Sequence, residues 1–242
     1  MIRFNFSDFI YEIKSFKKVC SSFVQNKNVL DEYAEKLKRV RDEYADGEVE
    51  VSITDDNPLL TNFSDGKYDS SGGGGERVFG KVTSVWQIKP IQDENLSSHK
   101  EFEISGKAST KVCLLDESYD RISMWKIEIG VEDSPGTHFH IQVEGDNGER
   151  PYPEWISVPR FPSILVTVPD VIDFLLGELF QNSWIKHASK SSDEMNRWRP
   201  HQQRRLSSLL EWKTAQVNNT MGSGWIAIEN GKPNPDLFLQ SN

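Results

Sequence analysis

Apolar side chains recur every three to four residues over 7–26 and again over 29–45, which is the period of an amphipathic helix. Ser7 or Asp8 can cap the first helix, and Asn28 can cap the second. The polar residues between them are too few for more than a turn, so the pattern predicts a helical hairpin. The first stripe consists of Ile10, Ile13, Phe16, Cys20 and Phe23, and the second of Leu30, Tyr33, Leu37, Val40 and Tyr44.

The period changes to two in the middle of the chain, where apolar and polar residues alternate. Short links between long strands are typical of an antiparallel meander, and its apolar face needs a cover. We therefore expect a four-stranded antiparallel meander, with strands at about 77–91, 101–115, 122–131 and 137–144.

Helical periodicity returns after a proline-rich stretch. Thr167 can cap a helix with a broad apolar stripe over 171–180, and a second helix is expected over about 193–217. Trp225, with Ile226 and Ile228 in the tail, predicts a packed edge strand. The predicted fold is α+β: an N-terminal helical hairpin, the four-stranded meander, and two C-terminal helices packed on the sheet.

The segment 46–76 differs in composition from both its neighbours. It carries eight acidic residues against one basic residue, Lys67, and it ends in the flexible run 70–75. A phosphate-binding loop is disfavoured because no Gly-Lys-Ser/Thr is present and a strand follows. We therefore divide the chain into a hairpin (1–45), an acidic Gly-rich linker and an α+β domain (77–242). The acidic residues are Asp46, Glu48, Glu50, Asp55, Asp56, Asp65, Asp69 and Glu76.

Composition narrows the classes of protein to consider. The 242 residues carry a net charge of −9, which argues against general coating of nucleic acid or membrane. No apolar run approaches the roughly 18 residues of a membrane helix, and the N-terminus lacks the layout of a signal peptide. Cys20 and Cys113 lack metal-binding spacing, which is typical of reduced, packed thiols. A cytoplasmic protein is expected.

The only clustered histidines lie in the last predicted strand. His138, His140 and Glu144 share one strand face, and two imidazoles two residues apart can chelate a divalent transition metal. The spacing His-x-His-x3-Glu matches half of a cupin metal motif, and the other half is not visible. The alternatives are that these histidines bond to neighbours on the polar face, or do acid–base work on a phosphate or base. A third ligand would come from His99, His187, His201 or a carboxylate.

Two basic features are candidate binding sites. Arg160 lies in a loop between prolines, where it suits capture of a carboxylate or phosphate; the alternative is that it ties the loop to the domain. The last helix has a basic start with Trp198 interleaved, which fits phosphate contacts and base stacking. It equally fits docking on the acidic segment 46–76 or on an acidic partner. The basic residues are Arg197, Arg199, Arg204, Arg205 and Lys213, against the single acid Glu211.

Several of these motifs occur together in a group of known families. From Ser123 to Asn219 the chain resembles uncharacterised bacterial families often met beside toxin–antitoxin and phage-defence genes. The shared features are the β-meander, the strand His138-Phe139-His140, the loop Pro159-Arg160-Phe161-Pro162, the apolar helix from Asp173 to Trp184, and Gln-x-x-Arg-Leu at 202–206. A second, topological likeness is to ubiquitin-conjugating and RWD-type folds. No cysteine follows the meander, so conjugating activity is not implied.

Three hypotheses about function follow. The first is a non-catalytic binding or regulatory subunit of a bacterial defence or toxin–antitoxin assembly, with a protein partner. The second is a metal-dependent hydrolase, most plausibly a nuclease, that uses His138 and His140. The third is a nucleic-acid-binding protein that uses the basic helix 197–205. Gly-x-Ser-x-Gly is absent, and neither cysteine has a histidine nearby in sequence, so nucleophilic catalysis finds little support.

Overall fold

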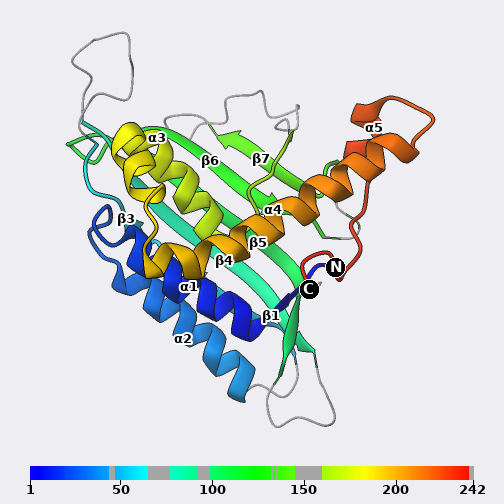
Figure 1. Ribbon diagram of the computed structural model, residues 1–242, viewed down its shortest axis with the longest axis horizontal. Coiled ribbons are helices and arrows are strands. Elements are labelled where there is room, and N and C mark those ends of the chain that lie inside the picture. The colour runs from blue at the N-terminus through cyan, green and yellow to red at the C-terminus, as the bar shows by residue number, and fades with distance from the viewer. Residues whose placement is uncertain are drawn as a thin grey trace.

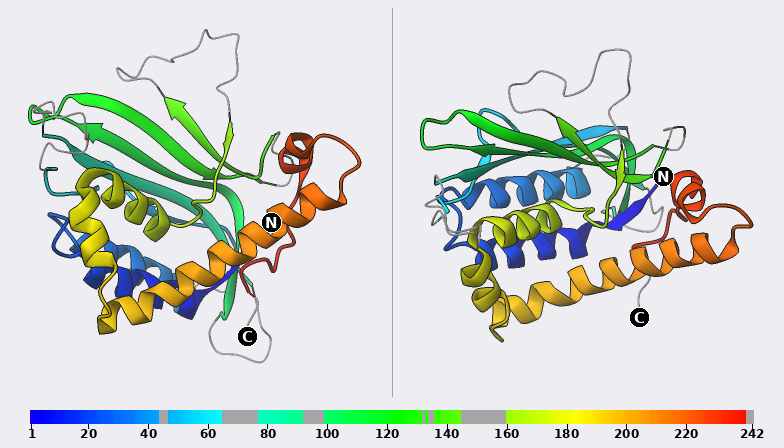
Figure 2. Two further views of the ribbon diagram at one scale, coloured as in Figure 1. Left: turned by 45° about the horizontal axis from the view of Figure 1, so that its top comes forward. Right: turned by 90° about the horizontal axis from the view of Figure 1, so that it is seen from above.

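The computed structural model describes residues 1–43, 47–64, 77–91, 99–131, 133, 136–144 and 160–239. Within them the chain forms an α+β fold with one antiparallel sheet, and helices cover one face of that sheet (Figures 1 and 2). The helices are α1 (Phe6–Cys20), α2 (Asn28–Glu43), α3 (Val168–Ala188), α4 (Asp193–Asn219) and α5 (Gly224–Asn230). The strands are β1 (Arg3–Asn5), β2 (Val49–Ile53), β3 (Leu59–Leu60), β4 (Phe79–Ile91), β5 (Glu101–Leu115), β6 (Arg121–Ile129), β7 (Phe139–Glu144) and β8 (Phe161–Pro162).

The sheet is wider than the expected four strands. Its order is β2-β4-β5-β6-β7-β8, with β1 paired to β5 and β3 to β4, so eight strands are described. The antiparallel run β4-β5-β6-β7 is the meander that the alternation predicted, but the count of four was wrong. Four strands lie outside the expected meander. β2 falls in the segment 46–76, and β1, β3 and β8 have two or three residues, which is too short for a period-two pattern to show.

The hairpin of α1 and α2 shares one hydrophobic core with the sheet. Phe9 of α1 stacks on Trp86 of β4 with ring centroids 5.3 Å apart, and Phe4 contacts the same indole. β2 and β3 lie in the segment that was expected to be a linker, and both pair with β4. The Gly-rich run 70–75 lies outside the described residues.

The C-terminal part also differs from the expectation. Three helices are described rather than two, and the tail that was predicted as an edge strand forms α5. Two neighbouring apolar residues, Trp225 and Ile226, fit a strand and a short helix equally, so the pattern alone did not decide. α3 packs on β4, whereas α4 crosses α1, as Figure 1 shows.

Gly80 sets the distance between α3 and the sheet. A Cβ atom at this position of β4 would lie 2.6 Å from Cδ2 of the buried Leu175 in α3. Glycine therefore allows the helix to approach the strand closely.

No helix among the described residues is both long and apolar enough to span a membrane.

Candidate functional site

His140 makes two contacts with protein acceptors. Its ring is 3% exposed, with Nδ1 3.0 Å from the backbone oxygen of Thr137 and Nε2 3.2 Å from Oε2 of Glu128. Glu128 faces His140 directly across the β6–β7 pair. The hydrogen bond with this histidine is the main reason why the pKa of the Glu128 carboxyl is lowered. His140 therefore has the hydrogen bonds to neighbours that were expected as the alternative to metal binding.

His138 has a different environment. It is also 3% exposed, and neither ring nitrogen has a hydrogen-bond partner among the described residues. Burial lowers the pKa of His138 to about 4, and Lys232 and the N-terminal amino group act in the same direction. The ring is therefore neutral at pH 7.

The proposed metal site stays a prediction. Among the residues that the structure describes, no group of three or more His, Cys, Asp and Glu is suited to hold a metal ion. The side chain of Glu144, the third expected ligand, lies outside the described part. Metal content of the purified protein beside a His138→Ala/His140→Ala variant tests the site directly.

The basic residues of α4 differ in their surroundings. Arg197 is exposed, whereas Arg199 donates to the backbone oxygen of Ala188 at the end of α3, 3.2 Å away. Arg204 lies 3.2 Å from Nδ1 of His201. Their combined role in binding nucleic acid stays a prediction. So does the role of Arg160, which is partly buried and lies beside Gly136.

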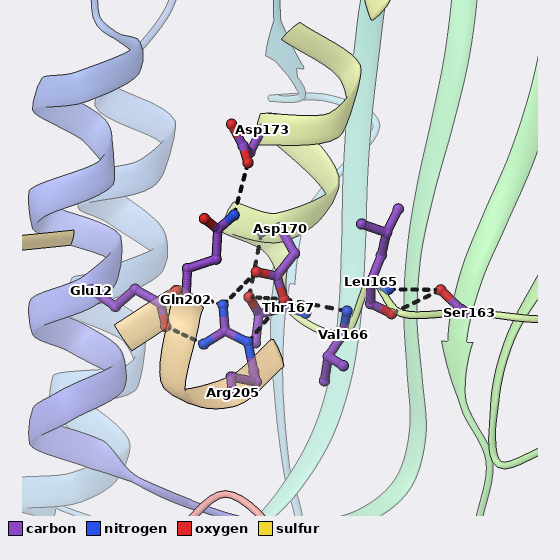
Figure 3. A network of polar contacts seen from close by, with 9 residues as sticks. All are labelled: Glu12, Ser163, Leu165, Val166, Thr167, Asp170, Asp173, Gln202 and Arg205. Carbon is purple, nitrogen blue, oxygen red and sulfur yellow. Dashed lines mark hydrogen bonds and ion pairs between the residues drawn. The ribbon is translucent and has the colours of Figure 1, made fainter. Parts of the chain in front are cut away.

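Arg205 lies in a buried charge cluster that sequence reasoning did not anticipate (Figure 3). Its Nη1 and Nη2 donate to the two carboxylate oxygens of Glu12 in α1 at 2.8 and 2.7 Å. Its Nε donates to Oδ2 of Asp170 in α3 at 2.9 Å, and its Nη2 donates to the other oxygen. One guanidinium therefore joins three helices. Bidentate contacts of this kind are the strongest that arginine makes.

Asp170 also caps α3. The N-cap Thr167 and the Asp170 side chain form a capping box, in which the carboxylate accepts from the backbone N–H of Thr167 at 3.0 Å. Asp173, one turn later, accepts from Gln202 of α4 at 2.7 Å and from the indole of Trp184 at 2.9 Å. Both acids thus connect the start of α3 to α4.

The surroundings of the charge cluster indicate a structural role. Burial raises the pKa of the Glu12 carboxyl. The cavity lined by Glu12 and Arg205 has a volume of about 40 Å³. A cavity of that size holds one or a few waters but no organic substrate. We conclude that Glu12, Asp170 and Arg205 fix the packing of α1, α3 and α4.

Six large apolar side chains near the C-terminal end are exposed, on α4, on α5 and in the turn between them. We call residues 206–230 the arm. Its first turns still pack on the core through the buried Leu209 and through Trp212, whereas its end projects beyond the sheet in Figure 1, with α5 lying against the end of α4. Leu206, Leu210 and Val217 recur at helical spacing, and Trp225 of α5 is 71% exposed. The apolar surface of the arm consists of Leu206, Leu210, Val217, Met221, Trp225 and Ile226.

Comparisons with known proteins assign no family to the chain: no family model, no curated protein and no solved structure matches it.

Proposed function

We propose that the chain is a non-catalytic binding subunit, and that its arm docks into an apolar groove of a basic partner protein. The observation that carries this proposal is the apolar surface of the arm, where large side chains recur exposed along α4, the turn after it and α5. Exposed apolar patches of this kind mark interaction sites, whereas scattered single residues do not.

The residue types suit a protein interface. Trp225 is 71% exposed and Met221 is fully exposed, and both supply a large contact area. Tryptophan is among the residues that most often dominate binding energy, and methionine adapts to irregular surfaces. Covering one such side chain contributes about 1.5–3 kcal/mol before the costs of association.

Charge favours a partner of opposite sign over a second copy. The chain carries a net charge of −9, so self-association would bring two strongly negative molecules together. Glu211 and Glu229 are exposed on the arm itself. A basic rim around the partner's groove would complement them and accelerate encounter.

The wider setting remains the one that the resemblance implies, a bacterial defence or toxin–antitoxin assembly. The hydrolase hypothesis gains no support from His140, because both its ring nitrogens face protein acceptors. The nucleic-acid hypothesis gains none from Arg205, which is enclosed by carboxylates.

The proposal can be tested with matched charge insertions. The full chain is used to isolate partners from its source cells; each partner is then identified, purified and titrated against the chain and its variants. Leu210→Glu and Trp225→Glu should weaken binding of the partner at least about tenfold, because each places a charge in the apolar contact. Ile185→Glu, at a 58% exposed apolar site of α3 outside the arm, is the control and should bind normally.

Two results would contradict the proposal. One is a purified partner that binds the arm variants as tightly as the unchanged chain. The other is that no purified partner binds the chain and that the apolar arm mediates only association between copies of the chain. Thermal unfolding of each variant shows whether the substitution has altered the fold.

A further inference from the structure

The face of the sheet opposite the helices carries an open groove. The groove lies beside β3 and crosses β4, β5 and the start of β6, and its volume is about 910 Å³. β3 and the turn between β5 and β6, which line the groove, lie at the end of the molecule away from α5 in Figure 1, so the groove is separate from the arm. Its polar and aromatic lining consists of Asp55, Lys81, Lys111, Tyr119, Asp120 and Arg121.

The groove is locally basic in an acidic protein. Lys81 and Lys111 lie on neighbouring strands and share one carboxylate: Asp55 is 2.8 Å from the Lys81 ammonium and 4.0 Å from that of Lys111. With Arg121, three cations face two acids, Asp55 and Asp120, which leaves a local charge of +1 where the chain as a whole has −9. An anion entering the groove therefore meets an excess of positive charge.

Tyr119 lines the groove and has an unusual backbone conformation. Its φ is 67°, a left-handed value that non-glycine residues rarely adopt, and its side chain is 62% exposed. Asp116, three residues earlier, stabilises the turn between β5 and β6. Its carboxylate accepts hydrogen bonds from the backbone N–H groups of Ser118 at 2.8 Å and Asp120 at 2.9 Å. The ring packs edge-on against Phe79, with centroids 5.0 Å apart.

The floor of the groove is apolar. It is formed by Leu60, Cys113 and Leu115, of which the last two are buried. This floor and the exposed Tyr119 ring suit a flat apolar part of a ligand, and the cations suit an anionic part. Aromatic bases stack on tyrosine, and phosphates are bound by lysine and arginine.

We propose that this groove binds a free nucleoside phosphate. The phosphate lies between Lys81, Lys111 and Arg121, and the base lies against Tyr119 over the apolar floor. The volume is within the range of small-molecule sites, and the open shape corresponds to modest affinity.

Calorimetric titration of the full chain with ATP, inorganic phosphate and a single-stranded oligothymidylate tests the proposal. ATP should bind with one site per chain, at least about tenfold more tightly than phosphate, because only ATP stacks a base. Lys111→Gln should weaken the binding of both ATP and phosphate about tenfold. Tyr119→Asn should weaken ATP about tenfold and leave phosphate unchanged.

The variants are chosen to keep the fold. Asparagine tolerates the left-handed φ at position 119, so Tyr119→Asn removes the ring without new backbone strain. Lys107→Gln removes an exposed lysine of β5 that does not line the groove, and it should bind ATP like the unchanged chain. Circular dichroism confirms folding before each titration.

Three results would overturn the proposal. The first is no heat with ATP. The second is ATP binding that Tyr119→Asn and Lys111→Gln leave unchanged. The third is tight binding of oligothymidylate with little binding of ATP, which would make the groove a site for single-stranded nucleic acid instead.

Discussion

The carboxylate of Glu12 in α1 accepts two hydrogen bonds from the guanidinium of Arg205 in α4, at 2.8 and 2.7 Å, although 193 positions separate them in sequence. The pair is almost fully buried, and Asp170 of α3 completes it. The Coulomb attraction and the hydrogen bonds offset the desolvation of these charges only while every partner is present. The cluster therefore makes the arrangement of the three helices sensitive to the loss of any one member.

Removal of the cation should destabilise the protein strongly. Arg205→Met leaves two buried carboxylates without a counter-charge, and we expect the free energy of unfolding to fall by about 3–5 kcal/mol. Urea unfolding monitored by circular dichroism measures this change. Arg197→Met, at an exposed position of the same helix, should change stability by less than about 0.5 kcal/mol. Equal effects of the two substitutions would refute a structural role for the charge cluster.

Stability should also depend on His138 between pH 7.5 and pH 5. The folded-state pKa of His138 is lowered to about 4 from an ordinary 6.5, so in this range the unfolded chain binds more protons at this site. The free energy of unfolding therefore carries no loss from His138 well above pH 6.5, and it falls as the pH is lowered from there toward 4. Linkage gives a loss of up to about 2 kcal/mol at pH 5 from this residue.

A variant separates the contribution of His138 from that of carboxyl groups that titrate in the same pH range. His138→Leu removes the buried imidazole, whose nitrogens have no partner in the described structure, and keeps an apolar side chain. Its stability should fall less than that of the unchanged chain between pH 7.5 and pH 5, as measured by urea unfolding at each pH. Parallel pH curves for the two proteins would show that His138 is accessible to water and titrates normally.

The contact between Gly80 and Leu175 predicts a contrast between two glycines. Gly80→Ala places a methyl group 2.6 Å from a buried leucine carbon, and we expect it to destabilise the protein by about 1–3 kcal/mol. Gly177→Ala meets no atom closer than 3.7 Å and lies inside α3, so it should be neutral or stabilise by up to about 1 kcal/mol. Thermal unfolding compares the two. A smaller effect at Gly80 than at Gly177 would mean that α3 does not approach β4 this closely.

The periodic segments were predictable from sequence because each has one apolar face and one polar face. The strand 101–115 matches β5 at both ends, and the two-residue period of β4, β6 and β7 was also visible. The two-residue strand β3 carries no such pattern; it forms because Leu59 and Leu60 pair with β4. Tertiary contact, not local sequence, creates strands of this length.

The candidate sites were harder to predict because side-chain type does not reveal the partner. Arg205 was grouped with the other arginines of α4 as a surface cation, yet it is buried between two carboxylates. Its neighbour Arg204 remains partly exposed. Glu12 gave no signal, since an isolated acid on an amphipathic helix normally faces water. Only the packing of α1 against α4 brings Glu12 and Arg205 together.

Site-specific photo-crosslinking at Trp225 tests the central proposal, docking of the arm on a protein partner, most directly. A benzophenone amino acid replaces Trp225 in the full chain in its source cells, and in a second chain it replaces Ile185, which is exposed on α3. The account predicts one crosslinked basic protein from position 225, absent from position 185. That protein, once purified, should bind the chain and lose affinity with Leu210→Glu. The same products from both positions, or crosslinks from position 225 to a second copy of the chain alone, would contradict it.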